Sequence, residues 1–126
     1  MGIDERDRLS HAVLGAAFEV SNILGHGFLE IVYRRALVAE LTRREIHARE
    51  EVPFPVFYKG DEVGRYFADI MVEDRMIIEL KCTETLSPAH VAQTLNYLKA
   101  GKIPIALLIN FGKPRIQYQR IILQGA

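Results

Sequence analysis

The sequence has a single cysteine, no tryptophan and no long uninterrupted hydrophobic segment. A lone thiol, Cys82, cannot form a disulfide within the chain, which suits a reducing cytoplasm. No apolar run approaches the ~20 residues that a membrane-spanning helix needs, and the N-terminus lacks the basic and apolar regions of a signal peptide. These absences predict a cytoplasmic protein that does not associate with membranes.

Acidic residues are missing from the last third of the chain. Residues 1–84 hold all 16 acids and 11 bases, whereas residues 85–126 hold five bases and no acid. If the fold places that basic segment beside the acidic part, a polyanion could be held by one and cut by the other. The alternative is that the charges are scattered over the surface without a common role.

The composition present is that of a globular domain. The chain has 126 residues, of which 49% are hydrophobic and 25% are charged. A chain of this length is large enough to bury about two-thirds of its unfolded surface. No linker, repeat or low-complexity segment divides it, so residues 1–126 are expected to form one domain.

Hydrophobic periodicity predicts the order ααβββαββ. Apolar residues recur at helical spacing in three segments, and shorter apolar or alternating segments indicate five strands. Pro53 and Pro55 place the first strand at a sheet edge or bulge. This pattern predicts an α/β fold with a mixed sheet flanked by helices. The expected helices are 4–24, 28–45 and 88–100, and the expected strands are 50–58, 65–72, 76–82, 103–111 and 115–123, with a turn at 59–62.

Two acids are expected to face each other on a central hairpin. A three-residue turn that pairs Val72 with Met76 places Asp69 opposite Glu79. Like charges so placed are destabilising, and a divalent cation between them is the simplest remedy. Lys81 shares the face of Glu79, and together they suggest a metal-dependent hydrolase. On these residues alone, solvated charges on an exposed sheet face are the alternative.

Alternation along the same strand turns Ile78, Leu80 and Cys82 toward the opposite face. We therefore expect Cys82 to pack in the core, in preference to acting as a nucleophile.

Polar residues on two helices could complete the site. Glu30 lies in the first turn of the second helix, where an acid also favours the helix dipole, so a purely local role is the alternative. On the third helix, Gln93 and Tyr97 form a stripe separate from the expected core stripe of Val91, Leu95 and Leu98.

Taken together, these residues resemble the PD-(D/E)XK nuclease superfamily. The resemblance lies in Asp69 and Glu79-x-Lys81 on a hairpin, a preceding helix with Glu30, and a following helix with Gln93-x-x-x-Tyr97. The last two features are similar to its recombination-exonuclease branch. Gly27-x-x-Glu30-x-x-Tyr33 and the strand segment 107–112 are similar to the small bacterial GxxExxY proteins. The resemblance implies a restriction-endonuclease-like core over the whole chain.

The resemblance also implies roles for individual residues. Lys81 would orient or activate the attacking water, and Gln93, Tyr97 and Tyr33 would contact the substrate. Glu30 would bind a second metal ion or position the water. The implied cofactor is Mg²⁺ or Mn²⁺, with oxygen ligands from Asp69, Glu79, the backbone of Leu80, and Glu30.

The function that we expect is metal-dependent hydrolysis of phosphodiester bonds, in DNA rather than RNA, with single-stranded ends as a candidate substrate. The main alternative is a non-catalytic module that keeps the nuclease fold and binds nucleic acid or protein. Hydrolysis of a small phosphorylated ligand is a third, weaker alternative. Intact acidic and lysine positions favour the enzyme. The absence of a strong basic excess favours a homo-oligomer or a protein partner that helps to hold the substrate.

Overall fold

The computed structural model describes residues 5–124 and confirms the predicted order of elements. Asp4, the expected first residue of the first helix, lies outside that range. No helix in residues 5–124 is long and apolar enough to cross a membrane. The elements are α1 (Glu5–Leu24), α2 (Glu30–Arg43), β1 (Ala48–Tyr58), β2 (Asp61–Val72), β3 (Met76–Lys81), α3 (Pro88–Gly101), β4 (Ile105–Asn110) and β5 (Gln117–Ile122).

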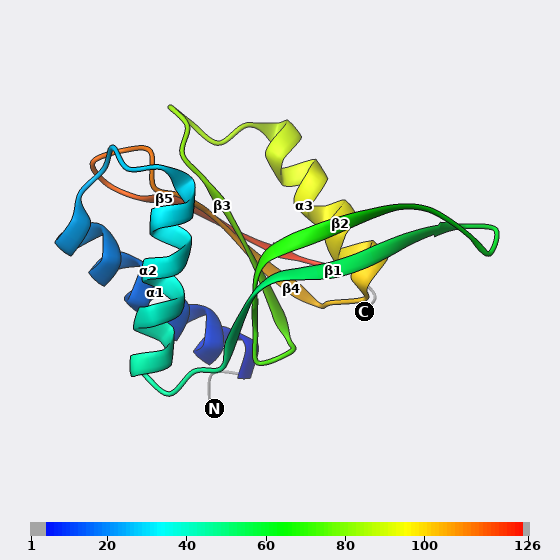
Figure 1. The fold of residues 1–126 in the computed structure, drawn as a ribbon, viewed down its shortest axis with the longest axis horizontal. Coiled ribbons are helices and arrows are strands. Elements are labelled where there is room, and N and C mark those ends of the chain that lie inside the picture. The colour runs from blue at the N-terminus through cyan, green and yellow to red at the C-terminus, as the bar shows by residue number, and fades with distance from the viewer. Residues whose placement is uncertain (1–4, 125–126) are drawn as a thin grey trace.

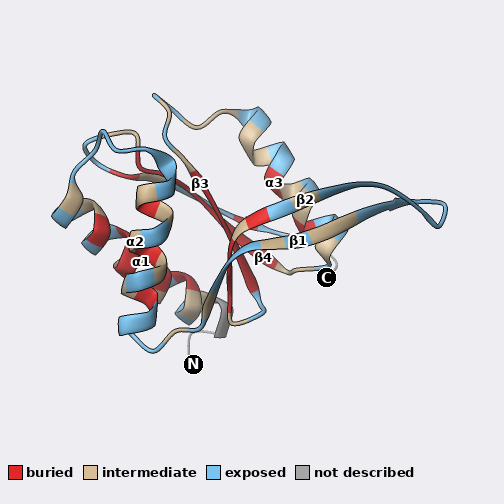
Figure 2. Ribbon diagram, viewed as in Figure 1, coloured by how far each residue is buried: buried red, intermediate tan, exposed pale blue. Residues whose placement is uncertain are grey.

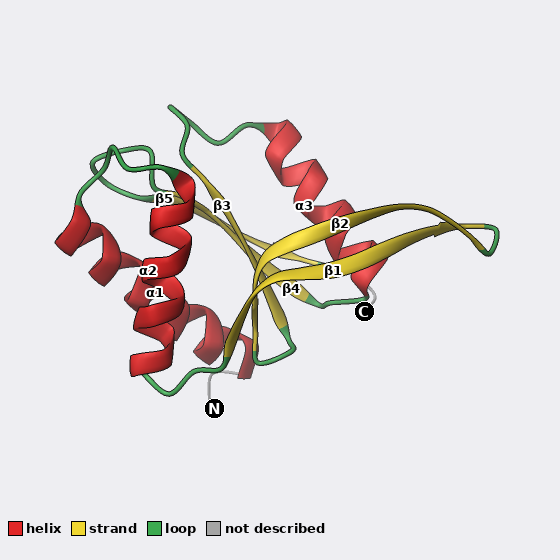
Figure 3. Cartoon of the chain, viewed as in Figure 1, coloured by secondary structure: helices red, strands yellow, loops and turns green. Residues whose placement is uncertain are grey.

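The five strands form one mixed sheet in the order β1-β2-β3-β4-β5 (Figure 3). Strands β3 and β4 are parallel and are joined through α3, whereas the other neighbours are antiparallel. Parallel neighbours need such a crossover because a tight turn can join only antiparallel strands. The predicted fold class, an α/β domain with a mixed sheet and flanking helices, is therefore confirmed.

Helices cover the two faces of the sheet unequally (Figures 1 and 2). Helices α1 and α2 pack on one face, where 17 buried residues, including Leu37 and Ile78, form the larger core. Helix α3 packs on the other face, over a smaller group of seven buried residues that includes Ile77 and Leu98. Because successive residues of a strand point to opposite faces, the central strands β3 and β4 supply both cores.

Helix α3 begins where its sequence predicts. The Ser87 side chain accepts a hydrogen bond from the His90 backbone N–H, and His90 Nδ1 accepts one from the Ser87 N–H. This reciprocal cap satisfies amides that the first helical turn leaves free, and Pro88 tolerates the first helical position because it has no amide hydrogen. The cap fixes the start of the helix that carries Gln93 and Tyr97.

Strands β1 and β2 extend beyond the sheet as a two-stranded arm (Figure 1). The pairing of β2 with β3 begins only at Ile70, so residues 53–67 pair within the hairpin alone. We call residues 53–67 the hairpin arm. Strand β1 is an edge strand and has a bulge between Val56 and Phe57, as its prolines predict.

Two sequence-based expectations near the strand ends are wrong. The turn expected at 59–62 is shorter, because Lys59 and Gly60 both adopt positive φ angles and β2 starts at Asp61. Two such residues make a tight hairpin turn. Cys82, expected in the core, is exposed. Strand β3 ends at Lys81, so side-chain alternation no longer fixes the direction of Cys82.

Candidate active site

The site forms where strands β2 and β3 separate. The pairs Val72–Met76, Met71–Ile77 and Ile70–Ile78 confirm the register that the three-residue turn predicts. Beyond them, side chains replace the backbone ladder. The Leu80 N–H donates to Asp69 Oδ2 at 2.7 Å, and the Asp69 N–H donates more weakly to Glu79 Oε1 at 3.4 Å. Both carboxylates therefore occupy the opening between the strands.

Glu79 is the most perturbed acid of the site. It is buried, with 6% of its surface exposed, and it lies against Asp69. Burial, and then the negative charge of Asp69, raise the pKa of Glu79 to about 9, while Lys81 acts in the opposite direction. Two acids that cannot both ionise easily in this position form a site that a cation would stabilise.

The backbone carbonyl of Leu80 faces the same opening. The Phe111 N–H donates to the Lys81 carbonyl at 2.9 Å, which directs that carbonyl toward β4. Successive carbonyls of a strand point to opposite edges, so the Leu80 carbonyl points toward β2, where the ladder has ended. It can therefore act as a third oxygen ligand beside Asp69 and Glu79.

The donors present suit a hard divalent cation. Asp69, Glu79 and the Leu80 carbonyl offer oxygen atoms only, as Mg²⁺ and Mn²⁺ prefer, and such ions complete their coordination with water. Within residues 5–124, no three or more His, Cys, Asp or Glu side chains are grouped closely enough to hold a metal ion. The side-chain ligands that the site offers to a metal ion are thus the carboxylates of Asp69 and Glu79. Glu30 is not grouped with them closely enough to bind the same ion.

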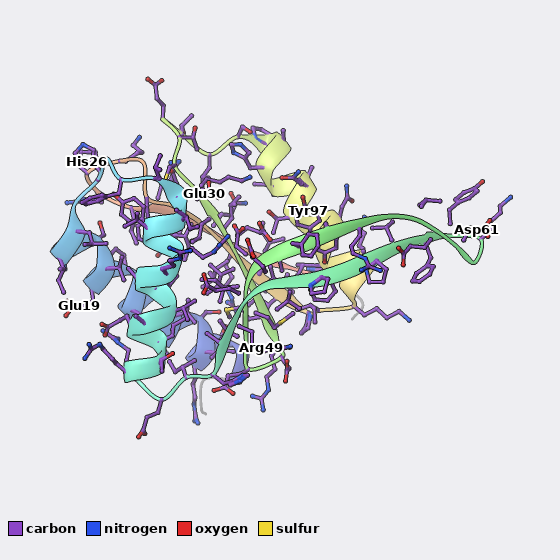
Figure 4. The ribbon with its side chains drawn as sticks, in the orientation of Figure 1. Glu19, His26, Glu30, Arg49, Asp61 and Tyr97 are labelled. Atoms are coloured by element: carbon purple, nitrogen blue, oxygen red, sulfur yellow. The ribbon has the colours of Figure 1, made fainter. Side chains whose placement is uncertain are left out.

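Glu30 nevertheless lies within the electrostatic reach of the site. It is the first residue of α2, after Leu29 at the N-cap, and no side chain caps this end of the helix. Partial burial and then the charge of Asp69 raise the pKa of Glu30, whereas Lys81 and Arg34 lower it. Figure 4 shows Glu30 on α2 and Tyr97 on α3, on either side of the central strands. The charges of Asp69 and Lys81 therefore act on Glu30 in addition to the helix dipole.

Arg34 is a neighbour of the site whose contacts the sequence did not reveal. Its guanidinium binds Glu50 at 3.0 Å and Glu51 at 3.2 Å, both on β1. Glu51 has a positive φ angle of 50°, and the β1–β2 pairing skips it at the position opposite Asp69. These ion pairs connect α2 to the strand that flanks the site.

Helix α3 brings Tyr97 and Gln93 to the other side. Burial and then the charges of Glu79 and Asp69 raise the pKa of Tyr97, while a hydrogen bond from the exposed Gln93 side chain lowers it. The Tyr97 ring stacks on Tyr66 with centroids 4.0 Å apart, and the Tyr66 hydroxyl donates to the Tyr97 carbonyl at 2.5 Å. Tyr97 therefore lies beside the carboxylates, with Gln93 at its outer edge.

The structure places Tyr33, expected to contact the substrate, inside the protein. It is fully buried and stacks on Phe111 with centroids 4.8 Å apart. Its hydroxyl donates to the Gly25 carbonyl at 2.7 Å and accepts a hydrogen bond from the Phe28 N–H at 3.2 Å. Tyr33 thus holds the loop that precedes Glu30, and we do not include it among the proposed substrate contacts.

The segment Asn110-Phe111-Gly112 holds the chain that follows Lys81. Buried Asn110 donates to the Thr83 carbonyl at 2.9 Å and accepts from the Thr83 N–H at 3.0 Å. A Cβ at Gly112 would lie 2.5 Å from the backbone of Thr83, so only glycine fits there. With Phe111 bound to the Lys81 carbonyl and stacked on Tyr33, this segment connects the α2 and β3 parts of the site.

Comparison with known proteins agrees with this geometry. Residues 7–121 match the model of the PD-(D/E)XK nuclease superfamily, so the chain belongs to that superfamily. Nucleases of this superfamily generally use divalent metal ions. No curated protein matches the chain.

Among solved structures, the fold is similar to the crystal structure of SSO0001, with a TM-score of 0.55 and 20% sequence identity. The match covers 73% of this chain and 48% of that chain. At this identity the likeness concerns the fold alone.

Proposed function

We propose that this protein is a metal-dependent nuclease that hydrolyses phosphodiester bonds of DNA. The observation that carries the proposal is the pair of carboxyl groups, Asp69 and Glu79, in contact where β2 and β3 separate. Burial of Glu79, and then the charge of Asp69, raise the pKa of Glu79 to about 9. Holding two carboxyl groups together beside Lys81 costs free energy of folding. Groups with strongly perturbed pKa values of this kind are concentrated at functional sites. Membership of a nuclease superfamily supports the same conclusion.

The residues have distinct proposed roles. Asp69, Glu79 and the Leu80 carbonyl would hold Mg²⁺ or Mn²⁺, which supplies Lewis-acid polarisation of the phosphate and a water of lowered pKa. Lys81 orients the attacking water and offsets charge that develops on the phosphate oxygens. Glu30 positions that water from the α2 side or contributes to a second ion. Gln93 and Tyr97 bind the substrate backbone beside the scissile bond.

Within the superfamily, we place the chain with the small bacterial GxxExxY proteins and near the recombination-exonuclease branch. The helical Glu30 and the Gln93–Tyr97 pair support this position, because α2 and α3 lie on either side of the central strands and Asp69 acts electrostatically on both Glu30 and Tyr97. Single-stranded DNA ends are the substrate that we propose.

The decisive experiment compares cleavage of labelled DNA by the wild type and Lys81→Met, purified identically. Methionine keeps an unbranched side chain and removes the ammonium, whose benefit lies mainly in the transition state. The variant should bind Mn²⁺ and DNA as the wild type does, yet cleave at least roughly a hundredfold more slowly, the scale of a lost acid–base group.

The other outcomes of this comparison are equally informative. Equal cleavage by both proteins would show that the activity does not come from this site. If neither protein cleaves single-stranded DNA, double-stranded DNA or RNA with Mn²⁺, the nuclease proposal fails and a non-catalytic binding module is the better explanation.

A further inference from the structure

A pocket between the hairpin arm and α3 adjoins the proposed active site. Its volume is about 530 Å³, within the ~300–1,000 Å³ range of small-molecule sites. Tyr97 lines the pocket, and burial together with the charges of Glu79 and Asp69 raises the pKa of its hydroxyl. Tyr66 lines it too, and burial together with the charge of Glu79 raises the pKa of Tyr66. Tyr66 lies on β2 three residues before Asp69, so a molecule in this pocket would lie on the α3 side of the proposed carboxylate site.

The charges of the pocket favour an anion. Arg65 on the arm and Lys99 on α3 line it, and no acidic residue does. By contrast, the hollow beside α1 that is lined by Arg8 and Arg75 also contains Glu73. Arg65 contacts Glu62 at 3.3 Å, but both side chains are about half exposed. An exposed ion pair of this kind is worth little, so Arg65 can exchange its partner for a phosphate.

The remaining walls suit a nucleobase. Tyr66 has ring partners on two sides, Phe54 and Tyr97, and so presents its edge. Tyr97 lines the pocket and has Tyr66 as its one ring partner among residues 5–124, so its ring is the aromatic surface that a base could contact. Asn96 adds an amide that can both donate and accept hydrogen bonds. Cations with an aromatic surface are the combination that binds single-stranded nucleic acid.

We propose that this pocket binds one unpaired nucleotide adjacent to the scissile phosphodiester. Lys99 and Arg65 contact its phosphates, while Tyr97 and Asn96 contact its base. This inference rests on the proposed nuclease function and specifies the substrate, because a base held in a duplex cannot enter the pocket. The arm and α3 thus select single-stranded DNA for the carboxylate site.

The test measures binding of a fluorescent single-stranded oligonucleotide by anisotropy. Lys81→Met with Mn²⁺ is the parent protein, and gels confirm that the DNA stays intact. Adding Lys99→Ala or Arg65→Ala should weaken binding about three- to tenfold and reduce the salt dependence by about one counterion. Asn96→Ala should weaken binding without changing the salt dependence. The matched control is Arg43→Ala, which removes an exposed charge at the far end of α2 from Glu30.

A blunt duplex of the same sequence provides the second arm. The three pocket variants should reduce binding to the duplex less than to the single strand. Equal losses of binding to both DNAs would overturn the proposal that the pocket binds an unpaired nucleotide. A loss of binding in Arg43→Ala as large as that in Lys99→Ala would overturn it as well. Melting temperatures verify folding, and Lys99→Gln and Arg65→Gln replace any alanine variant that melts early.

The failure of this inference can be told apart from failure of the function. If the parent binds single-stranded DNA and the pocket variants bind it equally well, the pocket assignment is wrong while the nuclease proposal stands. If the parent binds neither DNA, the proposed substrate itself is wrong and the pocket assignment falls with it.

Discussion

The two faces of the sheet differ in what their side chains do. The face under α1 and α2 is a continuous apolar core, with fully buried Leu37, Leu41 and Ile78. The face under α3 has fewer buried residues and carries Tyr66 and Tyr97 beside buried Glu79. One face supplies most of the burial that stabilises the fold, and the other accommodates a buried carboxyl group at the site.

This difference shows how a small domain can hold a costly site. The core under α1 and α2 anchors β3, so the other side of that strand, which also buries Ile77, can carry the costly carboxyl group of Glu79. Tyr33 and Phe111 lie in the apolar core, yet they also connect it to the loop before Glu30 and to the Lys81 backbone. Packing in the apolar core under α1 and α2 thus fixes the backbone around Glu30 and Lys81, whose side chains belong to the proposed site.

The largest expected effect on folding comes from the apolar face. Leu37→Ala removes a fully buried side chain and should lower the free energy of unfolding by about 2–5 kcal/mol. Gln93→Ala, at an exposed position of α3, should change it by no more than ~0.5 kcal/mol. Urea denaturation of the metal-free proteins measures both. Similar losses in the two variants would mean that the faces share the stability evenly.

The next effect concerns metal binding. Millimolar Mn²⁺ should raise the melting temperature of the wild type, because an ion that binds only the native state stabilises it by about 2.7 kcal/mol at 100 times Kd. Asp69→Asn should lose this shift. Without metal, the variant should be at least as stable as the wild type, since it removes a charge opposed to Glu79. A wild type that does not respond to Mn²⁺ would count against the site.

A further effect should appear in the pH dependence of stability. Folding raises the pKa of Glu79 from 4.5 to about 9, so the folded protein keeps a proton that the unfolded chain releases above pH 4.5. This contribution to stability is complete below pH 4.5 and declines as the pH rises toward 9. In metal-free thermal melts, the stability of Glu79→Gln relative to the wild type should therefore increase as the pH rises from 5 to 9, because glutamine does not titrate. Parallel curves would show that Glu79 does not titrate in this range.

Much of this organisation could be predicted from sequence because it depends on local periodicity. Apolar spacing defined the helices and strands, and the three-residue turn after Val72 determined the register that brings Asp69 to Glu79. Cys82 was misplaced because alternation predicts direction only as far as the strand continues, and β3 stops one residue earlier.

Contacts between distant segments could not be predicted in the same way. The ion pairs of Arg34 with Glu50 and Glu51, and the stacking of Tyr66 on Tyr97, depend on how elements far apart in sequence pack. Tyr33 illustrates the same limit. The family resemblance implied a substrate contact for Tyr33, but the motif does not reveal that Phe111 covers its ring.

The smallest predicted effect follows from that position of Tyr33. Tyr33→Phe keeps the ring against Phe111 and removes the hydroxyl that binds the Gly25 carbonyl and the Phe28 N–H. The free energy of unfolding should fall by about 1 kcal/mol, the usual worth of such hydrogen bonds. Tyr118→Phe is the control, because it removes a hydroxyl from an exposed tyrosine and should leave stability unchanged.

Kinetics separate the two possible roles of Tyr33. If Tyr33 acts by holding the loop before Glu30, Tyr33→Phe should lower kcat modestly and leave KM for DNA unchanged, since the substrate loses no contact. Cleavage of a labelled single strand by the wild type, Tyr33→Phe and Tyr118→Phe measures both parameters. A raised KM with unchanged kcat would instead indicate lost substrate binding, which a buried ring cannot provide directly. The loop would then have to move and expose Tyr33 when DNA binds.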